Sequence, residues 1–214
     1  MTLPNAHSGV KKIFIAELLQ IIGSILAIIG VFSLVGALGG YLVNGETADT
    51  MGAAALGGTF TLTAAILSIL ALILNLVGLK QASKDEPDRM GKAFMFAIIT
   101  LILSVVTAIC QNMDWDGAGS FFNALYSLAQ MCTIIFTIMG VSEVTQNISR
   151  QDVADMGPKI IVIEAIAIVA SIIAGIIGNT VGGVAAIVAL VLMIVAYFVF
   201  LVFLGRATSA LAKG

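Results

Sequence analysis

Six long apolar stretches alternate with short polar segments along the chain, and none has the every-second-residue alternation of barrel strands. Each is about as long as the roughly 18 residues that a helix needs to cross a bilayer. In hydrocarbon only helices and closed barrels satisfy their backbone groups, and the missing alternation favours helices. The sequence therefore predicts an all-α integral membrane fold with six transmembrane helices, at about 13–35, 56–77, 93–110, 121–139, 160–177 and 184–204.

Polar and glycine-rich segments mark where these helices are expected to end. Residues 1–10 are predicted to form a short tail, and the glycines at 36, 39 and 40 to mark the exit of the first helix. Turn signals occur at 44–46 and at 178–180. Ser149 and Asp152 have the spacing of a capping box, which predicts the start of a short surface helix in the linker 142–158.

The charges predict the orientation of the chain. In the six-helix arrangement, all ten basic residues fall on one side of the membrane. The loops of the opposite side carry Glu46, Asp49, Asp114 and Asp116 and no Lys or Arg. The positive-inside rule then places both termini and the linkers 80–92 and 142–158 in the cytoplasm of a bacterial-type cytoplasmic membrane.

A repeated pattern divides the chain into three parts. Three apolar segments start with Lys and reach Ser twelve positions later: Lys12 to Ser24, Lys92 to Ser104, and Lys159 to Ser171. A glycine precedes each Lys, and another glycine closes each following helix. Self-similarity of this kind is typical of repeat architectures. It predicts a single membrane domain, 1–214, built from three related helical hairpins at about 9–83, 91–147 and 157–213.

Composition limits the function classes. Hydrophobic residues make up 60% of the chain and charged residues 10%, against about 25% charged in soluble domains. A net charge of -2 without a basic run gives no support for a nucleic-acid partner. The chain has no HExxH, GxSxG or phosphate-loop motif, and its one histidine, His7, lies in the tail. We therefore expect no enzyme activity, no cofactor and no metal.

Two carboxylates fall inside the predicted membrane helices. Glu17 and Glu164 occupy equivalent repeat positions, and a base ends the same hairpin in each case, Lys80 and Arg206. The second repeat lacks both members, having Ala97 and Ser142 instead. This joint presence and loss is what an ion pair within a hairpin produces, since a long base can reach inward from the interface. A ligand or ion site and a proton-linked site remain as alternatives, because intramembrane carboxylates often serve function.

Further polar residues extend the same helix face. The predicted stripe consists of Gln20, Ser24, Thr100, Ser104 and Ser171, and Asn75 and Thr137 are expected to face it. Such residues form hydrogen bonds between helices, or they line a central cavity. Both interpretations stay open at this point.

Small residues and cysteines complete the candidate set. Ala170, Ala174 and Gly178 lie four apart, a spacing that lets helices approach closely within the chain or in a homo-oligomer. Cys110 and Cys132 are expected to be buried free thiols, with a disulfide as the alternative. Asp114 and Asp116 flank Trp115 and supply too few oxygens for a calcium site, so Trp115 is interpreted as an interfacial anchor.

The sequence leaves two function classes in front. The first is a small transport or channel protein with the polar stripe around its pathway. The second is a non-catalytic membrane subunit or scaffold that oligomerises or binds partner helices or lipid. The first is favoured because it is a common use of a multi-pass chain, and membrane lipid is the expected partner in both.

Overall fold

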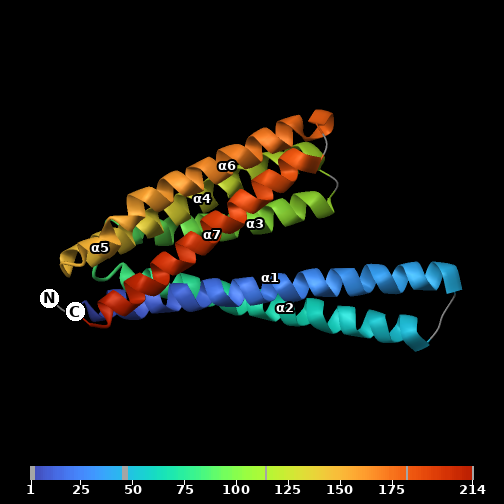
Figure 1. Ribbon diagram of the computed structural model, residues 1–214, viewed down its shortest axis with the longest axis horizontal. Coiled ribbons are helices and arrows are strands. Elements are labelled where there is room, and N and C mark those ends of the chain that lie inside the picture. The colour runs from blue at the N-terminus through green and yellow to red at the C-terminus, as the bar shows by residue number, and fades with distance from the viewer. Residues whose placement is uncertain (1–2, 45–47, 114, 182, 214) are drawn as a thin grey trace. The chain divides into compact units, whose positions relative to one another are not determined.

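The fold is all-helical in every residue range that the computed structural model describes. These ranges are 3–44, 48–113, 115–181 and 183–213, with the backbone alone described at 44, 48, 116, 171–181 and 183–186. The helices are α1 (Pro4–Asn44), α2 (Ala48–Ala82), α3 (Arg89–Asn112), α4 (Asp116–Asn147), α5 (Gln151–Ala154), α6 (Met156–Val181) and α7 (Gly183–Leu211) (Figure 1). Each of the six predicted helices lies within one of the long helices.

Membrane-spanning character is shown by length and composition. Among the described residues, five helices are long and apolar enough to cross a membrane: α1, α2, α3, α4 and α7. These helices carry many large apolar side chains that remain exposed within the chain. Exposed leucine, isoleucine and valine over whole helix faces are what a lipid-facing surface requires. The structure therefore indicates a membrane location.

Several predicted helix ends were wrong, and in each case the helix continues. Gly36, Gly39 and Gly40 lie inside α1, positions 178–180 lie inside α6, and the tail is helical from Pro4. A helix satisfies its own backbone groups, so glycine need not interrupt it in an apolar environment. The 41 residues of α1 span about 60 Å, twice the roughly 30 Å of a hydrocarbon core, so α1 extends beyond the membrane. The turn signal at 44–46 falls largely outside the described residues.

The predicted short surface helix is present, but it starts without the predicted capping box. α5 begins at Gln151, and the residue at its N-cap is Arg150, which makes no side-chain capping bond. Ser149 instead has a φ of 61°, a left-handed conformation that ends the preceding turn. This backbone places Ser149 outside the position from which a serine caps a helix.

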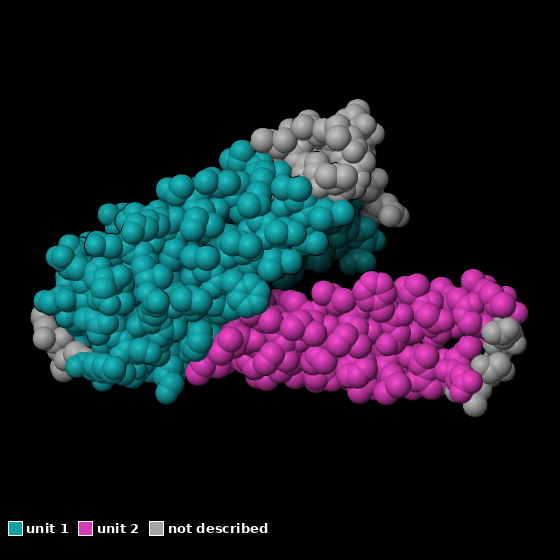
Figure 2. All heavy atoms as spheres, in the orientation of Figure 1, with its two compact units in different colours: residues 1–14, 76–214 teal, residues 15–75 magenta. Residues whose placement is uncertain are grey.

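The chain divides into two compact units, which are described separately. Unit 1 comprises residues 1–14 and 76–214, and unit 2 comprises residues 15–75 (Figure 2). Their division cuts through α1 and α2 and does not follow the predicted hairpin boundaries. The repeat stays a prediction.

The buried core of unit 1 lies where the two termini and the two polar linkers gather (Figure 1). Its largest fully buried side chains include Phe203, Leu79 and Ile138. Positions aligned by the repeat share this burial, since Ile13, Ala93 and Ile160 are each exposed by 1% or less. This shared burial in the core of unit 1 is what the predicted repeat requires of equivalent positions. The core of unit 1 also contains Val10, Met90, Val141, Val144, Leu204 and Ala207.

Unit 2 is a pair of helix segments that pack against each other through small residues at every seventh position. On α1 these buried residues are Ala16, Gly23, Gly30 and Ala37, and on α2 they are Gly57, Ala64 and Ala71. A Cβ at Gly30 would lie 3.0 Å from the Gly57 carbonyl oxygen, so the two backbones touch. Because lipid gives helices no hydrophobic reason to associate, close backbone packing takes that role. A seven-residue period also indicates a left-handed crossing.

Two adjacent linker carboxylates hold the starts of two helices in unit 1. Asp85 accepts hydrogen bonds from the backbone N–H of Ala6, at 2.8 Å, and from the Asn5 side chain, at 2.9 Å. Glu86 accepts from the backbone N–H of Arg89, at 2.8 Å, and of Met90, at 2.6 Å. Helix N-termini present unsatisfied N–H groups and favour negative charge. Asp85 and Glu86 therefore stabilise the first turns of α1 and α3.

The Glu86 cap gives a direct stability prediction. We expect Glu86→Ala to lower the free energy of unfolding by about 1–2 kcal/mol, because two buried N–H groups lose their acceptor. Denaturation of the purified full-length chain in detergent measures the effect. Asp88→Ala is the matched control, since Asp88 occupies the N-cap position of α3 without a side-chain capping bond. Equal losses in the two variants would show that the Glu86 bonds do not stabilise the helix.

Candidate functional site

The first predicted intramembrane carboxylate, Glu17, has an amide partner. It is half-buried on α1, and the Asn75 side-chain N–H group donates to its Oε1 at 3.2 Å. Both residues belong to unit 2. The expectation that Asn75 faces the polar stripe stays a prediction. Lys80 is exposed near the end of α2 and belongs to unit 1. The Glu17–Lys80 ion pair stays a prediction.

The second predicted pair involves residues on α6 and α7. Glu164 is half-buried on α6, and Arg206 is exposed on α7. The Arg206 Nη1 atom lies 3.8 Å from the Met156 sulfur at the start of α6. This contact holds the guanidinium at the linker end of unit 1. The pairing of Arg206 with Glu164 also stays a prediction.

The predicted polar stripe is divided between the two units. Gln20 and Ser24 are exposed on α1 in unit 2. Thr100 and Ser104 are half-buried on α3 in unit 1, and their hydroxyls donate to the carbonyls of Phe96 and Leu101 in their own helix. A hydroxyl bonded to its own helix needs no partner on another helix. The Ser171 side chain lies outside the described residues.

The remaining candidates are the small residues of α6, the two cysteines and Trp115. Ala170 is half-buried on α6, whereas the side chains of Ala174 and Gly178 lie outside the described part of the chain. Cys110 and Cys132 are free thiols, the first buried and the second half-buried. Trp115 is exposed, as an interfacial anchor requires. Among the described residues, no three His, Cys, Asp or Glu side chains group as metal ligands do.

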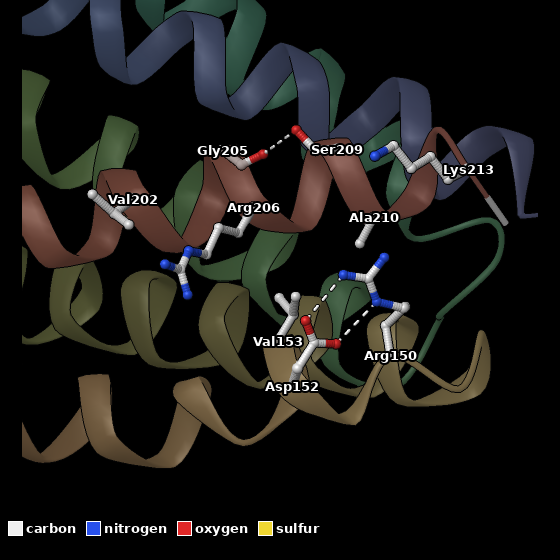
Figure 3. Close-up of a pocket in the computed structure, with 9 residues that line it drawn as sticks. All are labelled: Arg150, Asp152, Val153, Val202, Gly205, Arg206, Ser209, Ala210 and Lys213. Atoms are coloured by element: carbon white, nitrogen blue, oxygen red, sulfur yellow. Dashed lines mark hydrogen bonds and ion pairs between the residues drawn. The ribbon is translucent and has the colours of Figure 1, made fainter.

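A basic groove, which the sequence pattern did not predict, lies on the surface of unit 1. It has a volume of about 410 Å³ and is formed by the α4–α5 turn and the last turns of α7 (Figure 3). The first segment contributes Arg150, Asp152 and Val153. α7 contributes Val202, Gly205, Arg206, Ser209 and Ala210, and the turn after this helix contributes Lys213. Three cations thus face one carboxylate.

The charges of the groove are unequally paired. Arg150 binds Asp152 through two hydrogen bonds, of 2.9 and 3.0 Å (Figure 3). The hydrogen bond from Arg150 is the main reason that the pKa of Asp152 is lowered, so this carboxylate is ionised at neutral pH. In the part of the chain that the structure describes, no ion pair joins Arg206 or Lys213 to a carboxylate. The groove therefore has two cations available to an anion.

The positions of these residues explain why the sequence did not reveal the groove. Arg150 and Arg206 are far apart in the chain, and only packing of the α4–α5 turn near α7 brings them together. The available signal was local: Val202 and Arg206 lie four residues apart and share one face of α7. A second, smaller cavity of about 240 Å³ is lined by Ser142, Gln151 and Asp155, also at the linker end.

The chemistry of the larger groove suits an anion better than any covalent reaction. Guanidinium and ammonium groups donate hydrogen bonds and charge to phosphate or carboxylate oxygens. In comparisons with known proteins, the chain matches no protein-family model, no curated protein and no solved structure.

Proposed function

We propose that the chain is a non-catalytic, multi-pass membrane subunit whose helices bind lipid and partner helices. The termini and polar linkers face the cytoplasm in this proposal, because the charge distribution along the sequence favours that orientation. The apolar helix faces supply the binding surfaces, and the packed linker end of unit 1 holds its helices together. Association with a second copy belongs to the same proposal.

The observation that carries the proposal is the local satisfaction of the α3 polar residues. Thr100 and Ser104 both donate to carbonyls of their own helix. A water-filled pathway needs polar groups directed into a cavity. The two cavities described above lie at the linker end, among residues 142–158 and 202–213, and neither is lined by Thr100 or Ser104. These features favour a dry, packed helix face at this position.

Thiol accessibility tests this proposal. We expect a cysteine at Ser104, in a chain with Cys110→Ala and Cys132→Ala, to remain unmodified by a membrane-impermeant thiol reagent. The physical reason is that a thiol in a dry environment stays protonated and meets no aqueous reagent. Labelling is measured by mass on the full-length chain in membrane vesicles that expose either face.

Two further cysteines make this result interpretable. Lys84→Cys lies in the exposed linker and should label fully from one side. Ile102→Cys lies two positions from Ser104 and is 57% exposed within the chain, so it reports a lipid-facing position and should stay unlabelled. Labelling of Ser104→Cys at the rate of Lys84→Cys would contradict the subunit proposal.

Transport or channel activity is the second candidate, and the contact between Glu17 and Asn75 favours it. A carboxylate inside a membrane helix is costly, and proton and ion pathways are where such groups are found. Asn75 supplies this carboxylate with a hydrogen-bond donor from the neighbouring helix, at 3.2 Å. Water-accessible cysteines at both Ser24 and Ser104 would support this candidate in place of the first.

A further inference from the structure

The basic groove of unit 1 continues into an apolar track along the same face of α7. We propose that the groove and track together bind one anionic phospholipid, with its phosphate between Arg206 and Lys213 and one acyl chain along the track. The track consists of Val191, Val195, Phe198 and Val202, all exposed. This inference rests on the membrane location of α7, and it holds for either function proposed above.

The head-group end has the charge that a phosphate requires. Arg206 lies on the last turns of α7 and Lys213 lies two residues beyond the end of this helix, and both line the groove together with Ser209 (Figure 3). Arg150 lies across the groove and is engaged by Asp152. With one carboxylate against three cations, the groove carries an excess of positive charge.

The apolar end has the length of one bilayer leaflet. Positions 191, 195, 198 and 202 are spaced by four, three and four residues, so they follow the face that continues to Arg206. From Val191 to Val202 the helix rises about 16 Å, which is half of a roughly 30 Å hydrocarbon core. An acyl chain anchored by its phosphate at Arg206 therefore runs beside apolar side chains over its whole leaflet.

This continuity is what distinguishes a lipid from a free phosphate. A soluble anion needs only the three cations, and it gains nothing from an apolar track leading out of the site. Basic residues at the cytoplasmic interface also face the leaflet that carries most anionic lipid. The combined arrangement matches a molecule with a charged head and a chain of leaflet length.

Native mass spectrometry of the full-length chain in mild detergent tests the proposal. Phosphatidylglycerol and phosphatidylcholine are each titrated into the protein, and the affinity for the first bound lipid molecule is measured for each. We expect phosphatidylglycerol to bind more tightly, and Arg206→Gln with Lys213→Gln to weaken it about 25-fold, from about fivefold for each charge. Lys11→Gln with Lys84→Gln removes two exposed charges outside the groove and should change binding less than about threefold.

Three outcomes would overturn the inference. The first is an equal loss in the two double variants, which would make the attraction non-specific. The second is phosphatidylcholine binding as tightly as phosphatidylglycerol. The third is displacement of the lipid by glycerol phosphate or inorganic phosphate at equal concentration, which would identify a free-phosphate site. Asp152→Asn gives an independent reading in a folded chain: it releases Arg150 and should tighten phosphatidylglycerol binding about fivefold.

Discussion

Replacing Phe203 by alanine is expected to lower the free energy of unfolding of the chain by about 3 kcal/mol. Phe203 is on α7 with 0% of its surface exposed, in the core where the linkers and termini of unit 1 gather. Its removal leaves a cavity lined by groups from several helices. This loss of unfolding free energy lies at the low end of the range for phenylalanine in soluble cores. The reason is that an apolar side chain near a membrane keeps apolar surroundings when the chain unfolds.

The same helix supplies the control. Phe198 is 57% exposed on α7, and Phe198→Ala removes the same side chain without opening a comparable cavity. We expect its effect to stay within about 0.5 kcal/mol, as for other exposed substitutions. Denaturation in detergent micelles with far-UV circular dichroism compares the two variants. Equal effects would mean that the stability of unit 1 does not reside in its linker-end core.

The helices of this chain were predictable because apolar length is a local property of sequence. All six predicted helices are present, and the short helix in the linker 142–158 was also foreseen. The ends were less predictable. The glycines at 36, 39 and 40 suggested a helix end, yet a helix that satisfies its own backbone continues through such positions when nothing competes with it.

The contacts between helices were not predictable by the same means. Glu86 was part of a charged linker in the sequence, and only the fold shows that it caps α3. The pairing of Arg206 with a carboxylate on α6 stays a prediction, and only the fold shows that Arg206 also lines a groove with Arg150. The seven-residue spacing of Ala16, Gly23 and Gly30 is the sequence signal for the contact between α1 and α2. Side-chain partners depend on helix rotation and register, which apolar periodicity specifies weakly in a membrane helix.

Substituting Gly9 by alanine is expected to cost about 2–3 kcal/mol of stability. A Cβ at this position would lie 2.5 Å from the Gly78 carbonyl oxygen and 2.6 Å from the Ala82 backbone nitrogen. Both obstacles are backbone atoms, so a change of side-chain rotamer cannot relieve the clash. The start of α1 and the end of α2 must then separate, and the core around Val10 and Leu79 loses its packing.

Gly91 provides a test in which the repeat and the packing give opposite expectations. In the repeat, Gly91 closely precedes Lys92 as Gly9 closely precedes Lys12, but a Cβ at Gly91 would meet nothing within 4 Å. We expect Gly91→Ala to leave stability unchanged or raise it by up to about 1 kcal/mol, because alanine is the better helix former. Thermal denaturation of both variants in detergent separates the alternatives. If Gly91→Ala destabilises as much as Gly9→Ala, these glycines serve a shared feature of the three hairpins, and the local backbone contact is not the cause.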